Sequence, residues 1–319
     1  MAKVDKVVAF SGQQGPFDLS HYLKSGLAGG ICCAITHGAL CPVDVVKTRI
    51  QLQPAKYNKG MVSGFRTVIA EEGVGALATG LGPTAVGYFT QGFFKFGGVE
   101  VFKIQLAQRL GDEKAWEYRF PIYLASAACA EFIADIFLCP YEATRIKLVS
   151  NPEYANGLIS AFPKIIKDEG FVRGFYSGFI PMLFKQIPYT MAKFAVQGAA
   201  QEKICQVSGI NIETSSERTQ VGVSLASGVI AGAAAAIISH PADTLLSLVN
   251  KPGAGGNGGI LSRLGNLAVE VGFARLCLTG LGPRIVMIGT LTAGQFGIFD
   301  ITLAACGAKR FHFTDPASV

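Results

Sequence analysis

Three stretches of this sequence place a proline, an acid and, in two cases, bases in the same order. They begin at Pro42 (Pro-Val-Asp-Val-Val-Lys-Thr-Arg), Pro140 (Pro-Tyr-Glu-Ala-Thr-Arg-Ile-Lys) and Pro241 (Pro-Ala-Asp-Thr), spaced about a third of the chain apart. Each follows an apolar run long enough to cross a hydrocarbon core of about 30 Å. Charged side chains at membrane depth are costly unless they pair or serve a function. We call these stretches the collars and expect ion-pair or proton chemistry there.

A histidine and two carboxylates lie inside the apolar runs that precede the first two collars. They are His37, Glu131 and Asp135, and shifting His37 by the spacing of those collars lands on Asp135. An imidazole and carboxylates in adjacent apolar helices are typical of a proton relay. The alternative is a packing histidine that bonds a backbone carbonyl.

Three further apolar runs begin with aligned Gly-x-x-Pro motifs at Gly80, Gly178 and Gly280. Lysines recur inside these runs, and a lysine ammonium is a compact charge that can hold a phosphate. Lysines near the ends of a span could instead extend toward the interface. Counted from the glycines, the equivalent positions are Gly87, Lys185 and Met287, then Gln91, Tyr189 and Leu291, then Lys95, Lys193 and Gln295.

The elements that position these residues form a threefold repeat. Each repeat has two spans with a short amphipathic surface helix between them, so all repeats enter the membrane from the same side. We therefore predict an all-α membrane protein of six transmembrane helices in three pseudo-symmetric two-helix repeats. The expected spans are 22–40, 83–105, 122–138, 181–200, 221–239 and 283–305, and the surface helices are 62–70, 158–167 and 261–269. The corresponding parts are an N-terminal segment 1–19, repeats 20–110, 111–208 and 209–308, and a tail 309–319, with a glycine-rich loop at 253–259 that we expect to be mobile.

Composition supports a membrane protein and argues against several other classes. Charged residues make up 16% of the chain, against about 25% in soluble domains. The net charge of +6 comes without a basic tract that alternates with aromatics, so we expect no nucleic acid. The eight cysteines show no CxxC pair and no zinc spacing, which predicts reduced thiols, no metal site and no cofactor. The N-terminus has no signal-peptide layout.

The collars, each at the end of the first helix of a repeat and followed by an acidic-Gly pair in the first two repeats, resemble those of the mitochondrial carrier family over residues 20–306. Other stretches resemble the family members that carry phosphate. Two of the departures bear on the charged positions: Leu246 and Leu248 stand where the family has bases, and Val196-Gln197-Gly198 stands where the phosphate-carrying members commonly have Phe-Glu-Arg. The stretches with the resemblance are His37, Ala130–Asp135, Phe184–Tyr189, Pro241–Thr244 and Ile288–Thr292.

The resemblance implies that the collars form a gate on the matrix side. Family geometry pairs Asp44 with Arg145 and Asp243 with Lys47, which leaves Glu142 opposite Leu246 without a base. An ion pair that roughly balances its own desolvation suits a gate, and a static brace is the alternative. Glu142, as an acid without a base, would be able to carry a proton together with His37, Glu131 and Asp135.

The resemblance also places a substrate in the central cavity, near Lys185. At the opposite face, Glu100, Lys103 and Asp300 would form a cytoplasmic gate, with Gly198, Gln201 and Leu303 at the equivalent positions of the other repeats. This gate has few charge pairs, so its closed state should be weak, which favours a symporter over a strict exchanger. The expected substrate contacts are Lys185, Gln91, Lys95, Gly87, Tyr189 and Met287.

The resemblance, together with these features, implies a multi-pass protein of the mitochondrial inner membrane that is not an enzyme. We expect it to import inorganic phosphate with a proton, equivalently in exchange for hydroxide, by alternating access, with membrane lipid as a further partner and cardiolipin a candidate at the surface helices. A carrier for another small anion or for a metal ion such as copper is an alternative, as is a membrane receptor or scaffold. A membrane-embedded enzyme would use Glu131, His37 and Cys33, but the sequence has no Gly-rich phosphate cradle or nucleophile elbow.

Overall fold

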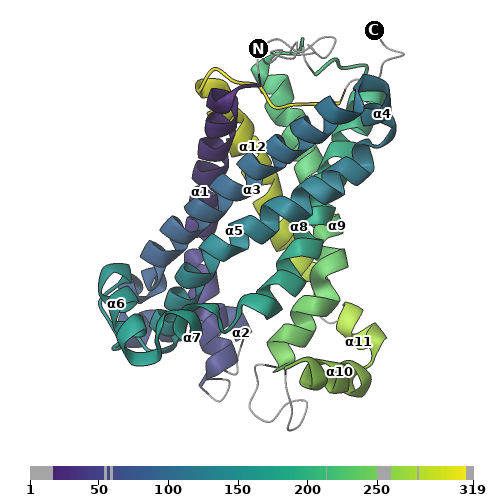
Figure 1. The fold of residues 1–319 in the computed structure, drawn as a ribbon. Coiled ribbons are helices and arrows are strands. Elements are labelled where there is room, and N and C mark those ends of the chain that lie inside the picture. The colour runs from purple at the N-terminus through teal and green to yellow at the C-terminus, as the bar shows by residue number, and fades with distance from the viewer. Residues whose placement is uncertain are drawn as a thin grey trace.

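Six long helices run side by side through the protein (Figure 1). The computed structural model describes residues 17–53, 56–57, 60–212, 214–249, 260–278 and 280–313, and within these ranges no residue lies in a strand. Helices of 25 to 34 residues are about 37 to 51 Å long, more than a membrane core requires. They are α1 (Leu19–Leu52), α3 (Leu81–Leu110), α5 (Arg119–Ser150), α8 (Phe179–Ser208), α9 (Glu217–Val249) and α12 (Leu281–Ala305).

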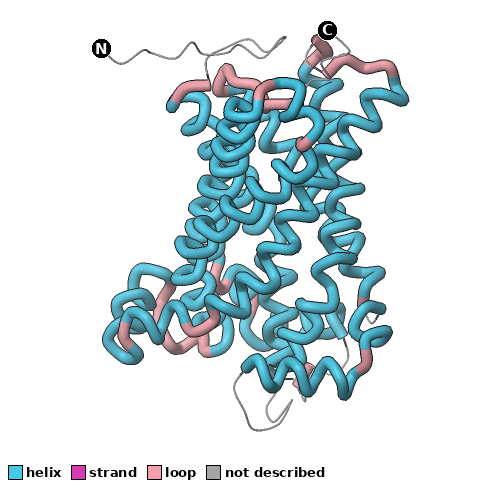
Figure 2. The backbone as a smooth tube through the Cα atoms, turned by 45° about the vertical axis from the view of Figure 1, so that its right-hand side comes forward, coloured by secondary structure: helices cyan, strands magenta, loops and turns pink. Residues whose placement is uncertain are grey.

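The short helices mark the two ends of the molecule. Those between the long helices of each repeat gather at one end, and the described chain begins and ends at the other (Figure 2). They are α2 (Gly60–Glu72), η1 (Val74–Ala78), α6 (Leu158–Glu169), α7 (Phe171–Tyr176), α10 (Ile260–Val271) and α11 (Phe273–Leu278), while α4 (Asp112–Glu117) lies at the terminal end. The predicted surface helices are therefore confirmed.

The long helices close into a ring in chain order, since each packs on the next and α12 returns to α1. Glycines bring the two helices of a repeat together. A Cβ on Gly92 would lie 2.2 Å from the Gly29 carbonyl oxygen, and one on Gly232 would lie 2.6 Å from the Ile288 carbonyl oxygen. Only glycine permits these backbones to approach so closely, as in other helix pairs packed in lipid.

Four of the long helices are long and apolar enough to cross a membrane by length and composition alone: α1, α5, α9 and α12. Helices α3 and α8 have 30 residues each but carry several charged side chains. Those of α3 include Lys95, Glu100 and Lys103, and all three are buried. The ring hides these charges from lipid, so the two helices can span the membrane in spite of their composition.

The collar prolines do not end their helices, which corrects the sequence-based boundaries. Pro42, Pro140 and Pro241 all lie inside helices that continue about two turns or more beyond them. A proline deprives the carbonyl four residues earlier of its helical donor. In α5 that carbonyl belongs to Ile136, and the Tyr176 hydroxyl donates to it at 3.0 Å. Neighbouring side chains can thus preserve a helix that the sequence pattern appeared to end. The glycine-rich loop 253–259 lies outside the described residues.

Candidate functional site

The first two collars meet at the surface-helix end. Arg145 of α5 pairs with Asp44 of α1 at 3.1 Å, as expected, and also binds Glu142 at 3.1 and 3.2 Å. The prediction that Glu142 lacks a base is therefore wrong. Acid and base three residues apart share one helix face, so Glu142 finds its partner within its own collar and not in a neighbouring repeat.

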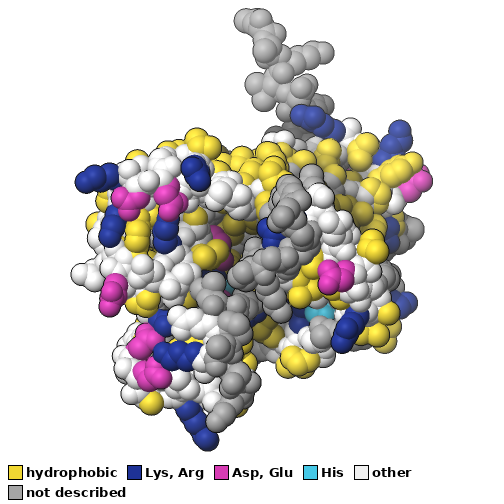
Figure 3. Space-filling model, turned by 90° about the horizontal axis from the view of Figure 1, so that it is seen from below, with side chains coloured by type: hydrophobic (Ala, Val, Ile, Leu, Met, Phe, Trp, Pro, Cys, Tyr) yellow, Lys and Arg dark blue, Asp and Glu magenta, His cyan; other side chains and the backbone are white. Residues whose placement is uncertain are grey.

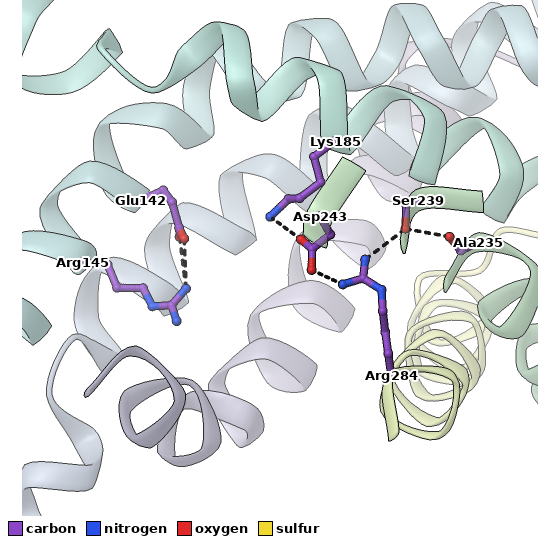
Figure 4. Close-up of polar contacts among 7 residues, drawn as sticks. All are labelled: Glu142, Arg145, Lys185, Ala235, Ser239, Asp243 and Arg284. Carbon is purple, nitrogen blue, oxygen red and sulfur yellow. Dashed lines mark hydrogen bonds and ion pairs between the residues drawn. The ribbon is translucent and has the colours of Figure 1, made fainter. Parts of the chain in front are cut away.

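The third collar differs from the expected arrangement. Asp243 forms an ion pair with Arg284 of α12 and lies 3.7 Å from Lys185 of α8. Arg284 also donates to the Ser239 hydroxyl at 3.0 Å. Among the ion pairs of the described residues there is none between Asp243 and Lys47, because Asp243 turns toward the second helices of the repeats. Figure 4 shows this cluster separate from the pair of Glu142 and Arg145.

Arg284 was missed by sequence reasoning, although a signal for it exists. It directly follows the aligned proline of the third repeat, where the other repeats have Thr84 and Met182. A cation that is present in only one of the three repeats breaks their threefold symmetry, which is the signal that pointed to Arg284. Figure 3 looks onto this end of the molecule and shows charged side chains around a central hollow. Lys185 remains 38% exposed there, so the charged cluster is reachable from this side.

A buried polar cluster joins α3 to α5 near the middle of these two helices. Lys95 pairs with Glu131 at 2.9 Å, and Gln91 donates to Glu131 at 3.0 Å and to Asp135 at 3.3 Å. Each of the four side chains is at most 4% exposed. The cluster has two carboxyl groups and one ammonium, and one oxygen of Asp135 is buried without a hydrogen-bond partner. A single proton on this pair of carboxyls would make the cluster neutral.

The structure brings Glu131 and Asp135 together as predicted but gives His37 a different partner. Its ring stacks on Tyr88, with centroids 3.6 Å apart and planes within 8°. Within the described part of the chain, no hydrogen bond or ion pair joins His37 to Glu131 or Asp135. A relay through His37 would therefore need a rearrangement or a water, whereas Glu131 and Asp135 are already connected by Gln91.

The other predicted substrate contacts have varied surroundings. Gly87 faces Tyr141, since a Cβ there would lie 2.6 Å from the tyrosine Cβ. Tyr189 lies beside Thr292, and Met287 is partly buried. Lys95 and Gln91 are occupied by the carboxylates of α5, so of the predicted cations only Lys185 is open toward the hollow.

An aromatic layer closes the centre of the ring above this cluster. Phe96, Phe194 and Phe296 occupy equivalent positions, with ring centroids 5.1, 5.7 and 5.5 Å apart. The Lys193 ammonium lies 5.0 to 5.7 Å from all three rings and bonds Gln295. The sequence signal was a phenylalanine directly after each of the aligned positions Lys95, Lys193 and Gln295.

The terminal end is closed by a second buried cluster, which we call the mouth cluster. Glu100 and Lys103 of α3 form an ion pair one helical turn apart, and the Ser224 hydroxyl of α9 donates to Asp300 of α12. Lys103 also donates to the backbone carbonyl of Phe311 at 2.9 Å. The predicted gate residues are thus gathered here, but Glu100 pairs within its own helix and the chain after α12 takes part.

Comparison with known proteins is consistent with this architecture. The family model described as "Mitochondrial carrier protein" matches residues 18–110, 117–207 and 217–308. The chain therefore belongs to the mitochondrial carrier family and is a multi-pass transporter of the mitochondrial inner membrane. Its six long helices are the transmembrane helices, and the surface helices lie on the matrix side.

Three relatives narrow the similarity. Over 90% of this chain and 95% of its own length, "Mitochondrial substrate carrier family protein N" of Dictyostelium discoideum is 50% identical. "Phosphate carrier protein, mitochondrial" of Caenorhabditis elegans is 45% identical over 91% of this chain and 83% of its own. "Solute carrier family 25 member 3" of Homo sapiens is 43% identical over 88% of this chain and 75% of its own. Because the surface helices lie on the matrix side, the collars lie at the matrix end of the carrier. The mouth cluster lies at the opposite, cytoplasmic end.

Proposed function

We propose that this carrier imports inorganic phosphate together with a proton into the mitochondrial matrix by alternating access. Relatives 40–45% identical to it bear the name phosphate carrier. The observation that carries the proposal is the buried cluster of Lys95, Gln91, Glu131 and Asp135, which holds one more carboxyl than base. A carrier that moves an anion without a proton would need cations along its pathway. It would not need a buried carboxyl in excess of the buried bases.

The phosphate site is formed by Lys185 and Arg284. Both hold Asp243 in the structure, so a phosphate can take the place of this carboxylate. The arginine fork can bind two phosphate oxygens while the lysine adds a point charge. Tyr189, one helical turn beyond Lys185 on α8, and the partly buried Met287 line the approach. Exchange of one anion for another leaves the two cations paired at every stage and keeps the energetic cost of the exchange low.

The proton is carried by the carboxyls of Glu131 and Asp135. Placing it on the unpartnered oxygen of Asp135 leaves Glu131 as the partner of Lys95 and the cluster neutral. When the proton leaves, the cluster carries one negative charge that attracts the Lys185 and Arg284 region and repels a bound phosphate. Phosphate and proton are therefore favoured together and released together.

The two ends of the ring act as the gates. In the structure the cytoplasmic end is closed by the mouth cluster and the aromatic layer, whereas the third collar is held by α8 and α12. Closure of the matrix end would require Asp243 to leave Arg284 and Lys185 and to join Lys47. Phosphate bound to Arg284 and Lys185 would release Asp243 for this step, which links substrate binding to gate closure.

The test is uptake of labelled phosphate by proteoliposomes with and without an imposed pH gradient. We expect accumulation only when the external side is more acidic, and loss of this gradient dependence in Glu131→Gln. The control is Glu117→Gln, which removes an exposed acid on α4. Accumulation that ignores the pH gradient, or full coupling in Glu131→Gln, would overturn the proposal. Labelled sulfate in the same vesicles distinguishes a phosphate carrier from a general anion carrier.

A further inference from the structure

The chain that follows α12 crosses the cytoplasmic mouth. After a turn at Gly307 (φ 68°), residues 308–313 pass over the ends of the long helices (Figure 1). We call residues 308–313 the terminal strap. Arg310 and Phe311 are 8% and 1% exposed, so this strap is inserted among the helices and does not merely cover them.

The three repeats leave the mouth cluster short of one base. The first repeat supplies Glu100 and Lys103, and the third supplies Asp300 with Leu303 in place of the base. The second repeat has Gly198 and Gln201 there and contributes no charge. At these positions the helices therefore present two acids and one base, and α1 adds only the imidazole of His21, whose Nε2 lies 3.9 Å from Glu100. A buried carboxylate without a cation is costly, and Arg310 of the strap supplies the missing positive charge.

Arg310 is seated among residues of the second and third repeats. Its guanidinium donates to the side-chain oxygen Oε1 of Gln197 and lies 4.9 Å from the ring centroid of Phe296 and 6.0 Å from that of Phe299. Gln197 in turn donates to Gln201 at 2.8 Å, the position at which the second repeat lacks its base. Electrostatic interaction between Arg310 and Asp300 links the strap to the unmatched acid. The strap thus fills the part of the gate that the helices leave uncharged.

Phe311 fastens the strap to the first repeat through its backbone. Its carbonyl accepts from Lys103 at 2.9 Å, and its N–H donates to Glu100 at 3.1 Å. The strap therefore contacts both members of the Glu100–Lys103 ion pair that α3 brings to the mouth cluster. The helices at the mouth can therefore separate only if these bonds break and the strap leaves.

A departure of the second repeat from the family pattern makes room for the strap. At Gly198, which stands where the first repeat has Glu100, a Cβ would lie 2.6 Å from the Tyr123 ring. That ring packs on Phe313 of the strap, with centroids 5.3 Å apart, and lies 5.6 Å from the Lys103 ammonium. An acid at Gly198 would displace Tyr123 and remove the surface on which the strap rests.

We propose that the terminal strap is a part of the cytoplasmic gate, that Arg310 is its second base, and that the strap leaves the mouth whenever the carrier opens to the intermembrane space. This inference rests on the alternating access of the proposed function. It makes Arg310 a gate residue, although Arg310 lies outside the three repeats and outside the long helices.

The test follows access to the mouth and does not depend on the transported substrate. A single cysteine replaces Val99, which is 1% exposed on α3 at the position equivalent to Gln197, in a chain whose eight cysteines are changed to serine. A membrane-impermeant thiol reagent is added outside proteoliposomes and the labelling rate is measured. We expect Arg310→Gln to raise this rate about tenfold, since the charge-assisted bonds of the seated strap are lost. Truncation after Gly307 should have at least the same effect.

Two further variants separate a gate from a general structural role. Arg109→Gln removes the same charge from an exposed residue at the end of α3 and should leave the labelling rate unchanged. Leu303→Lys places a base three residues after Asp300, as Lys103 follows Glu100, and should restore slow labelling in Arg310→Gln. Equal labelling of Arg310→Gln and Arg109→Gln, or failure of Leu303→Lys to restore protection, would overturn the proposal. Failure of wild-type phosphate uptake would instead count against the proposed function.

Discussion

The pairing of Lys95 with Glu131 is the residue-scale feature that links the stability of the carrier to the proposed proton coupling. Both side chains are buried within the ring, and their 2.9 Å ion pair compensates for the loss of water around them. Removing one member of such a pair leaves an uncompensated buried charge, which costs about 3–5 kcal/mol. The loss of stability is smaller when Glu131 is replaced as well. Comparison of the single and double variants therefore separates the effect on stability from the effect on transport.

Lys95→Met should therefore lower the unfolding temperature of the detergent-solubilised carrier and abolish pH-driven phosphate uptake. The double variant Lys95→Met with Glu131→Gln should recover most of the unfolding temperature, because two neutral side chains replace the ion pair, but it should not recover uptake. Measurement of both quantities on the same preparations is decisive. Recovery of uptake in the double variant would show that the pair is only structural.

Residue identities in this cluster were predictable from the sequence, whereas several partners were not. Charged residues in apolar runs pointed to Glu131, Asp135 and Lys95, because burial of a charge in a membrane requires a reason. The stacking of His37 on Tyr88 and the binding of Asp243 by Arg284 depend on how far each helix is rotated. A repeat alignment predicts how deep in the membrane a residue lies. It does not determine which neighbouring side chain that residue contacts.

At the scale of elements, the crossings of paired helices depend on single glycines. Gly92 has no room for a side chain, since a Cβ would lie 2.2 Å from the Gly29 carbonyl oxygen, while Gly222 of α9 has nothing within 4 Å. Gly92→Ala must push α1 and α3 apart, and we expect a loss of about 1–3 kcal/mol from overpacking. Gly222→Ala should be neutral or stabilising, as alanine favours the helix by about 1 kcal/mol. Unfolding temperatures of the two variants give the comparison, and equal shifts would contradict the close approach.

The terminal strap should respond to acid through His312. Burial, together with the positive charges of Arg310 and Lys103 and against the charge of Glu100, lowers the pKa of His312 in the seated strap. A released strap would have a histidine of ordinary pKa, about 6.5. Below that pH the released strap gains a proton that the seated strap does not take up. The free energy that favours the seated strap over the released one therefore falls by at most about 1.4 kcal/mol per pH unit. Above pH 6.5 both forms are neutral and seating is unaffected.

We therefore expect labelling of the Val99→Cys reporter to increase, relative to the same reporter in a His312→Gln background, as the external pH falls from 7.5 to 5.5. Because thiol reactivity itself decreases with acid, rates are compared with those of His312→Gln, which lacks the titrating group. A constant ratio between the two variants across this range would contradict the expectation. The result bears on the strap alone, since no phosphate is present.

The collars show why element boundaries were harder to predict than element types. Apolar runs and repeated motifs identified every long helix, but proline was taken as a stop. The structure instead continues α5 past Pro140, because the Tyr176 hydroxyl binds the Ile136 carbonyl from another element. Such a contact is tertiary, so no local pattern around Pro140 indicates it. The repeat boundaries at 20–110, 111–208 and 209–308 stay predictions.

At the scale of the whole molecule, the threefold repeat was readable from the sequence and the departures from symmetry were not. Repeated motifs and an even number of spans per repeat determine a closed ring, and the family match confirms it. The missing bases at Gln201 and Leu303 were also visible. Their replacement by Arg310 was not, because the strap belongs to no repeat and its position follows from space that Gly198 leaves beside Tyr123.

The same asymmetry separates the two ends of the carrier. At the matrix end the pair of Asp44 and Arg145 is already formed, whereas Asp243 is held by Arg284 and Lys185 and not by Lys47. At the cytoplasmic end the strap, the mouth cluster and the aromatic layer are all in place. If the two ends alternate, release of the strap must favour the pairing of Asp243 with Lys47.

Paired cysteines can measure this link between the ends. In a cysteine-depleted chain, Lys47→Cys with Asp243→Cys should form little disulfide under a mild oxidant, and truncation after Gly307 should raise the yield several-fold by moving the population toward the matrix-closed state. Asp44→Cys with Arg145→Cys replaces a pair that is already formed and should show the same yield with and without the strap. Equal yields for the Lys47 and Asp243 pair in full-length and truncated chains would mean that the strap does not influence the matrix gate. A rise confined to that pair would show that the chain after Gly307, at the cytoplasmic mouth, controls a contact at the opposite side of the membrane.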